Sequence, residues 1–159
     1  MDKPGVYELV MGSSLKELLE LAGSRETKMV QVGGASGRML PEKGLDIPLS
    51  YETVLGAGAV TVFDKSRDPI EAALKTMEFF REESCGKCAP CREGTRVMID
   101  ILDRFNKKKG AYDDIAALET LSNTMNLASL CGLGQTAPNV VSDTLNNFRD
   151  EYLSRIKTG

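Results

Sequence analysis

Two different periods of apolar residues divide the chain into two parts. Up to about residue 64, apolar residues come in short runs separated by Gly, Pro and Ser, which is typical of strands joined by turns. From residue 68 onward they recur every three or four positions, which predicts amphipathic helices. Charge and proline cluster over residues 65–69, where we expect the boundary. The pattern therefore predicts an α+β chain with two domains, residues 1–64 and 68–159.

The first domain reads as a small ubiquitin-like roll, or β-grasp. Strands are expected over Val6–Met11, Lys28–Val32 and Ala59–Phe63, with a further extended stretch over Leu45–Leu49. A helix is expected over Leu15–Ala22, because Ser13 or Ser14 can cap it and Gly23 can end it. The glycines over residues 33–37 follow a strand but open no helix, so we interpret them as a tight turn between strands, with a loop rich in Gly, Ser and Pro after the strand, and not as a phosphate-binding loop.

The second domain is expected to be a four-helix bundle. Asp68 can cap the first helix and Pro69 can occupy its first turn. The apolar stripes place the next helices over Arg92–Phe105, opened by Cys91, then Tyr112–Met125, and finally Pro138–Ile156. Short connections between these helices favour an antiparallel bundle.

The four cysteines are arranged as three plus one. Cys85, Cys88 and Cys91 are each separated by two residues, and Cys131 stands alone downstream. Three closely spaced thiolates with one distant thiolate form the ligand pattern of a [4Fe–4S] cluster. In an antiparallel bundle the loop after the first helix and the loop after the third fall at the same end, which brings the four sulfurs together. We therefore predict that all four cysteines hold one [4Fe–4S] cluster at that end of the bundle.

Other uses of four cysteines fit this spacing less well. A structural zinc site usually has two separated C-x2-C knuckles. A disulfide framework suits a short secreted chain, and here no basic segment precedes an apolar one as in a signal peptide. A redox-active C-x-x-C needs only two of the cysteines. The main alternative is a structural or interaction module that binds zinc or no metal and has no redox activity.

The residues around the cysteines favour an anionic cofactor. Lys87, Arg92 and Arg96 lie within or just after the motif and can offset the negative charge of a cluster held by thiolates. A helix that starts near Cys91 would also point its free N–H groups at the sulfurs.

The cysteine-bearing segments resemble a known family. Residues Glu83–Thr95, together with Leu130–Gly134, closely resemble the flavoprotein subunit of NADH:quinone oxidoreductase (respiratory complex I). They are equally similar to the matching subunits of NAD(P)-linked and electron-bifurcating hydrogenases and of NAD-dependent formate dehydrogenases. The segment Asn139–Ile156 also resembles this family, and the resemblance covers essentially the whole chain.

The resemblance implies a soluble-ligand-binding β-grasp domain followed by a helical cluster domain, with Cys85, Cys88, Cys91 and Cys131 as the ligands. In the family a further strand precedes the Pro4-Gly5 turn, and we expect that strand to be missing here. NADH gives a hydride to FMN in a preceding domain, and electrons then pass through the cluster to iron–sulfur clusters of partner subunits. That flavin domain is not in this sequence, so we expect either a piece of a longer flavoprotein or a separately encoded electron-transfer part, and in both cases a chain that does not oxidise NADH alone.

Composition limits the other function classes. The 159 residues carry a net charge of -3, which argues against a nucleic-acid partner. The sequence contains no histidine, the commonest general base and nitrogen ligand. Since no apolar run approaches the length of a membrane span, we expect no direct membrane insertion. A cytoplasmic protein is expected, peripheral to a membrane complex only through its partners.

Overall fold

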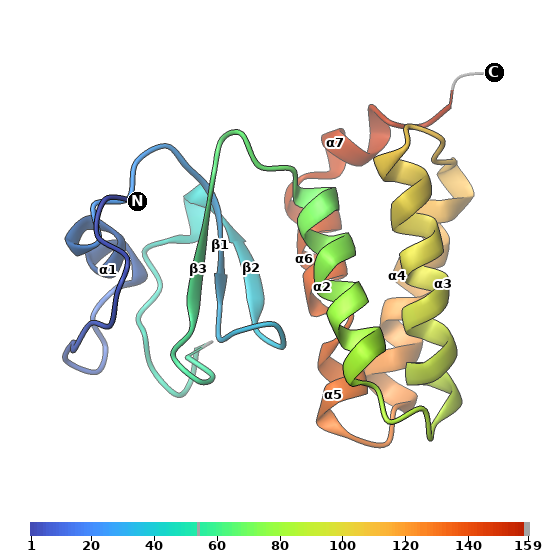
Figure 1. Cartoon of the computed structure of the whole chain (residues 1–159), viewed down its shortest axis with the longest axis horizontal. Helices are drawn as coiled ribbons and strands as arrows, with labels where there is room; N and C mark the ends of the chain where they lie inside the picture. The colour runs from blue at the N-terminus through green and yellow to red at the C-terminus, as the bar shows by residue number, and fades with distance from the viewer. Residues whose placement is uncertain (54, 158–159) are drawn as a thin grey trace. The chain divides into compact units, whose positions relative to one another are not determined.

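The chain separates into two compact units. A computed structural model describes residues 1–53 and 55–157 (Figure 1). The units are Met1–Arg67 and Asp68–Gly159, and positions 158 and 159 of the predicted second domain lie outside the described residues. The first unit contains a small sheet and the second is helical, so the predicted combination of α and β structure is confirmed. Within the described ranges, no helix combines the length and the apolar character that crossing a bilayer requires.

The first unit is built on a three-stranded antiparallel sheet. Its elements are α1 (Leu15–Leu21), β1 (Thr27–Val32), β2 (Arg38–Pro41), the 3-10 helix η1 (Glu42–Gly44) and β3 (Val60–Asp64). β1 lies in the centre and pairs with β2 on one side and β3 on the other. A compact core stabilises the unit by removing apolar side chains from water, and it consists of Leu15, Leu19, Val30, Val32, Leu45 and Leu49.

Two predicted signals in this unit are confirmed. The Ser14 hydroxyl accepts the Glu17 N–H at 3.1 Å, and the Glu17 carboxylate accepts the Ser14 N–H at 3.0 Å, which forms a capping box at the start of α1. Gly33 and Gly34 have φ angles of 87° and 77° in the turn that leads from β1 to β2. Since only glycine adopts this region without strain, the tight-turn interpretation holds.

One predicted strand in this unit is wrong, and one predicted extended stretch holds only in part. Val6–Met11 forms no strand, because no strand of the described chain pairs with it, and Val6 and Val10 are left exposed. Leu45–Leu49 starts in the turn after η1 and contributes one isolated bridge, between Pro48 and Ser14. The strand that pairs with β1 is instead β2, within the predicted loop, where Arg38 faces Val32 at the start of the hairpin.

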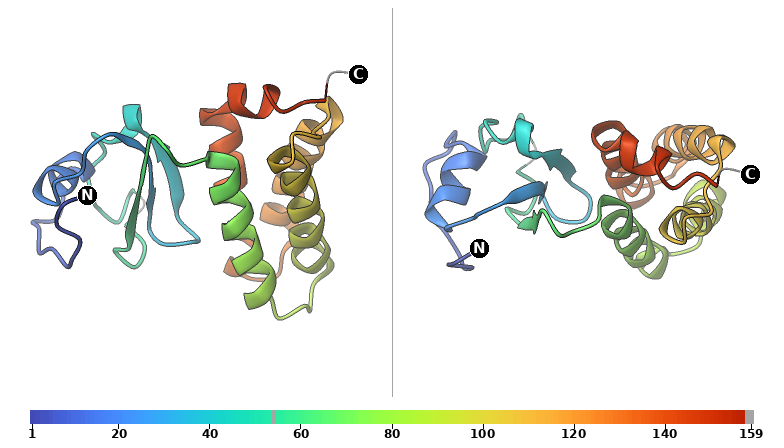
Figure 2. Two further views of the ribbon diagram at one scale, coloured as in Figure 1. Left: turned by 45° about the horizontal axis from the view of Figure 1, so that its top comes forward. Right: turned by 90° about the horizontal axis from the view of Figure 1, so that it is seen from above.

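The second unit packs its long helices in a closed ring. Its elements are α2 (Pro69–Glu83), α3 (Ala89–Asn106), α4 (Tyr112–Ala128), α5 (Gly132–Thr136), α6 (Asn139–Asn147) and α7 (Arg149–Leu153). α2 contacts α3 and α6, and α4 contacts the same two helices, as the end-on view in Figure 2 shows. The largest side chains in the shared core include Met77, Phe80, Met98, Leu102, Phe105, Leu118, Met125 and Tyr152.

Two helix boundaries differ from the prediction. α3 begins at Ala89 with Cys88 as its N-cap, and not at Cys91, because Pro90 is already suited to the first helical turn. The predicted fourth helix is not continuous. It is broken at Phe148, where φ is -131° and ψ is 37°, and α5 precedes it. After this break, α7 carries Tyr152, whose ring centroid lies 5.2 Å from that of Phe105.

Candidate functional site

The connection between α2 and α3 and the one between α4 and α5 lie at the same end of the helical unit (Figure 1), and the four cysteines lie in or directly beside them. Cys85 lies in the loop between α2 and α3, Cys88 caps α3, and Cys91 lies in the first turn of α3. Cys131 is the N-cap of α5, directly after α4. All four are free thiols; Cys91 is buried, Cys88 is half-buried, and Cys85 and Cys131 are exposed.

The loop between α2 and α3 is shaped by a glycine turn and held by the side chain of Arg92. Gly86 has a φ of 72°, a left-handed conformation that favours glycine. Its carbonyl oxygen accepts a hydrogen bond from Arg92 Nη1 at 2.8 Å, and Arg92 Nε pairs with the Glu93 carboxylate at 2.8 Å. Arg92 therefore closes the loop as well as placing a positive charge beside the cysteines.

The segment that carries Cys131 lies against the start of α3. The backbone N–H of Leu130 is the main cause that lowers the pKa of the Cys88 thiol, followed by the N–H of Cys91. A Cβ atom on Gly134 would lie 2.9 Å from the Cβ of Cys91, which is closer than side chains normally approach. The structure thus brings Cys88 and Cys91 together with the connection that bears Cys131.

The groups at this end suit an iron–sulfur cluster. Four thiols form a soft donor set, as such clusters require. The backbone N–H groups of Leu130 and Cys91 lower the pKa of the Cys88 thiol, because N–H groups near a thiolate stabilise its charged form. The hydroxyl of Ser129 is buried beside Gly134 and has no hydrogen-bond partner among the described residues. Buried polar atoms in folded proteins normally have a hydrogen-bond partner.

A site for a single metal ion is not preformed. Among residues 1–53 and 55–157, no group of three or more Cys, His, Asp or Glu side chains is placed to hold one metal ion. Thiolates around one zinc ion stand roughly 4 Å apart, because each Zn–S bond is about 2.3 Å long in a tetrahedron. The described side chains do not form that tight arrangement.

The predicted positive charges are arranged mainly as ion pairs. Arg92 and Arg96 both lie near the Glu93 carboxylate, with Arg96 Nη1 3.9 Å from it. The side chains of Arg92, Arg96 and Glu93 are each about half exposed or more, so solvent screens these pairs. Of this group, Arg92 also contributes to the lowered pKa of Cys88, as the smallest of several causes.

Three residues near the cysteines were not predicted from the sequence. Ser84 Oγ lies 3.2 Å from Cys91 Sγ, Ser129 places its buried hydroxyl beside the site, and Gly134 makes the room for Cys91. The sequence offered one clue to the two serines, which is their position next to the cysteines. Ser84 precedes Cys85 by one residue and Ser129 precedes Cys131 by two.

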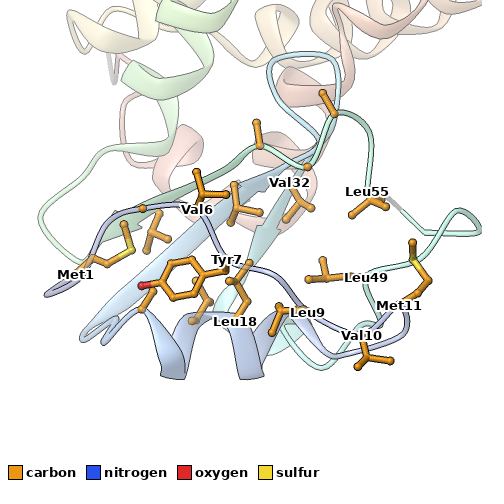
Figure 3. A pocket seen from close by; sticks show the side chains of 18 residues that line it. Met1, Val6, Tyr7, Leu9, Val10, Met11, Leu18, Val32, Leu49 and Leu55 are labelled. Carbon is orange, nitrogen blue, oxygen red and sulfur yellow. The ribbon is translucent and has the colours of Figure 1, made fainter.

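A second feature is an apolar pocket in the first unit (Figure 3). Its volume is about 450 Å³. The extended segment 5–11 and residues 55–62, which lead into β3, form two of its sides, and Leu18 and Leu19 of α1 contribute to another. Apolar side chains and glycines line it apart from Tyr7, whose hydroxyl donates a hydrogen bond to the Lys3 carbonyl. The pocket therefore suits an apolar occupant.

Comparisons with known proteins identify the family. The sequence profile of the NADH-ubiquinone oxidoreductase-F iron-sulfur binding region matches residues 71–155. A subunit of the NADH-quinone oxidoreductase of Mycobacterium tuberculosis is 38% identical, over 99% of this chain and 38% of the relative. The NADP-reducing hydrogenase subunit HndC of Solidesulfovibrio fructosivorans is 37% identical, over 96% of this chain and 33% of the relative.

A solved structure agrees with these relatives. A chain of an NAD+-reducing [NiFe]-hydrogenase matches 99% of this chain with a TM-score of 0.92 and 34% identity, and 28% of its own length is covered. This chain thus spans roughly a third of the length of such relatives. The predicted resemblance and the predicted class of cofactor, a [4Fe–4S] cluster, are confirmed. The chain belongs to the family of the NADH-ubiquinone oxidoreductase-F iron-sulfur binding region.

Proposed function

We propose that this chain relays electrons in a larger NADH-linked oxidoreductase, through a [4Fe–4S] cluster held by Cys85, Cys88, Cys91 and Cys131. The main support is the contact between two distant segments, since Gly134, three residues after Cys131, lies against Cys91. The backbone N–H of Leu130 also lowers the pKa of the Cys88 thiol. These contacts align the connection that bears Cys131 with the three-cysteine loop.

The chain's own residues have distinct tasks in this proposal. Cys91, which is buried on α3, would hold the cluster together with the half-buried Cys88 and the exposed Cys85 and Cys131. The N-terminus of α3 supplies N–H groups and the positive end of a helix dipole, both of which favour bound negative charge. When bound, the cluster takes up and passes on single electrons.

The wider reaction follows from the relatives, which are subunits of NADH-quinone oxidoreductases and of NAD- or NADP-reducing hydrogenases. We assign NADH oxidation and FMN to a further domain of the same parent subunit, and electron acceptance to iron–sulfur clusters of partner subunits. The chain by itself then turns over no NADH, has no nucleic-acid partner and does not itself insert into a membrane. A cytoplasmic location, peripheral to a membrane complex through those partners, fits this assignment.

The domain organisation in this proposal is a β-grasp over residues 1–64 and a four-helix bundle over 68–159. For the bundle, the ring of contacts among α2, α3, α4 and α6 is the support. For the β-grasp, α1 shares one core with the sheet. The pocket between segment 5–11 and the strand β3 at the sheet edge has the place and apolar lining that a further strand of such a fold would need.

Metal content tests the electron-relay function against its alternative, a zinc-bound or metal-free interaction module. The protein is purified without oxygen and reconstituted with iron and sulfide, and its iron, acid-labile sulfide and visible spectrum are measured. We expect about four iron and four sulfide per chain, because a cubane contains four of each. Stoichiometric zinc in protein expressed with ample iron, or a colourless protein that cannot be reconstituted, would refute the proposal.

A further inference from the structure

Ser84 has a hydroxyl group whose direction is fixed by its neighbours. It is the C-cap of α2, one residue before Cys85. The backbone N–H of Gly86 donates to Ser84 Oγ at 3.2 Å, and the same Oγ lies 3.2 Å from Cys91 Sγ. A hydroxyl has one proton and two lone pairs, so the bond from Gly86 leaves the Ser84 proton free for Cys91. Once Cys91 is a thiolate it has no proton, and Ser84 must be the donor.

Ser129 presents a second hydroxyl to the same place from the other segment. Its side chain is buried and its Oγ has no hydrogen-bond partner among the described residues. A Cβ atom placed on Gly134 would meet Ser129 Oγ at 2.6 Å and Cys91 Cβ at 2.9 Å. Ser129 and Cys91 therefore both pack against Gly134. An unpaired buried hydroxyl is unfavourable, and a group bound at Cys91 would offer Ser129 an acceptor close by.

We infer that Ser84 and Ser129 are positioning residues that donate hydrogen bonds to the sulfur atoms of the cluster site and thereby raise its reduction potential. This inference rests on the proposed function, since it requires the cluster on Cys91. The physical reason is electrostatic. Reduction adds negative charge that the sulfurs share, and a donated hydrogen bond stabilises the reduced form more than the oxidised form.

The test for Ser84 compares two variants of nearly equal shape. Ser84→Thr keeps the hydroxyl, whereas Ser84→Val replaces it with a methyl group. The reduction potential of each reconstituted protein is measured by a titration followed in the visible and electron paramagnetic resonance spectra. We expect Ser84→Val to make reduction roughly three- to tenfold less favourable, where tenfold is 59 mV for one electron, and Ser84→Thr to stay near the wild type.

The test for Ser129 has a matched control in the same helical unit. Ser122, on α4, is also buried with an Oγ that lacks a partner among the described residues, but it lines a polar pocket between α4 and α6. Ser129→Ala should also make reduction roughly three- to tenfold less favourable, while Ser122→Ala should leave the reduction potential unchanged. An equal shift in the two alanine variants would overturn the role of Ser129.

The outcomes separate this inference from the proposed function. A wild-type protein that binds no cluster refutes the proposed function itself. If the wild type and the variants all carry full iron and sulfide, unchanged potentials in Ser84→Val and Ser129→Ala overturn the inference. Where Ser84→Val loses the cluster, retention in Ser84→Thr supports the hydroxyl, and equal loss in both variants counts against it.

Discussion

Gly134 of α5 lies against Cys91 of α3, with 2.9 Å between the Cβ of Cys91 and the position that a Cβ on Gly134 would take. Real Cβ atoms do not approach other atoms so closely, so only glycine leaves the neighbouring groups where they are. Gly134 follows Cys131 by three positions, whereas Cys91 is a candidate ligand far earlier in the sequence, so the contact joins the two cysteine-bearing segments.

We therefore expect Gly134→Ala to separate the two segments. The added methyl group would meet Ser129 Oγ at 2.6 Å as well as Cys91, and overpacking of a tight core costs about 1–3 kcal/mol. Urea unfolding of the metal-free protein measures this loss, and iron content after reconstitution measures the effect on the cluster. Gly132→Ala is the matched control, because nothing lies within 4 Å of its Cβ position. Equal behaviour of the two variants would contradict the packing argument.

Cys131→Ser separates the role of this thiol in the cluster from its role in packing. Cys131 is exposed, so the metal-free variant should unfold within about 0.5 kcal/mol of the wild type. The reconstituted variant should lose most of its iron and sulfide, because serine is a harder and poorer ligand for iron than a thiolate. Iron, sulfide and urea unfolding are measured on the same preparations. Full iron content in this variant would show that the fourth ligand lies elsewhere.

The helix starts and the cysteine pattern could be predicted because they depend on nearby residues. Ser14 and Asp68 cap their helices through hydrogen bonds to residues two or three positions away, which a sequence displays directly. The three-plus-one spacing of cysteines, with antiparallel helices between, predicted that two distant connections meet. Gly134 and Cys91 provide that meeting point.

The features that could not be predicted depend on tertiary packing. The break at Phe148 lets Tyr152 reach the core, and neither residue is a helix breaker by type. β2 ends at Pro41 and has too few apolar residues to stand out, yet the hairpin with β1 fixes it as a strand. The orphan hydroxyl of Ser129 becomes visible only when its burial and its distance to Gly134 are known.

Stability at low pH should depend on Asp114. Its carboxylate accepts hydrogen bonds from Arg104 and, at 3.0 Å, from the N–H of Ala111 at the start of α4. The hydrogen bond from Arg104, with a smaller contribution from Ala111, lowers the pKa of Asp114 below its ordinary value of 3.8. A carboxyl whose pKa is lowered on folding stabilises the protein above its unfolded pKa, and this stabilisation is lost as the pH falls through the folded value.

Asp114→Asn should therefore lower the free energy of unfolding by about 1–3 kcal/mol at neutral pH, since it weakens charge-assisted hydrogen bonds at a buried side chain. The difference between this variant and the wild type should shrink as the pH falls from about 5 towards 3. Urea unfolding across this range is the measurement. Asp113→Asn, at the exposed neighbouring position, is the control and should show a much smaller difference. A constant difference at every pH would contradict the role of the ionised carboxylate.

Tyr152 should contribute to stability mainly through its ring and only slightly through its hydroxyl. The side chain is fully buried, its ring packs edge to face on Phe105, and burial raises the pKa of its hydroxyl. The hydroxyl lies 2.9 Å from Thr144 Oγ1, which itself donates to the Val140 carbonyl at 2.8 Å.

Tyr152→Phe removes one hydrogen bond but leaves Thr144 with its backbone partner, so we expect a loss of about 1 kcal/mol. Tyr152→Ala empties the space beside Phe105 and should cost about 3–5 kcal/mol. Urea unfolding measures the loss in free energy of unfolding for each variant. A loss in Tyr152→Phe as large as that in Tyr152→Ala would mean that the hydroxyl, and not the ring, holds α7 in place.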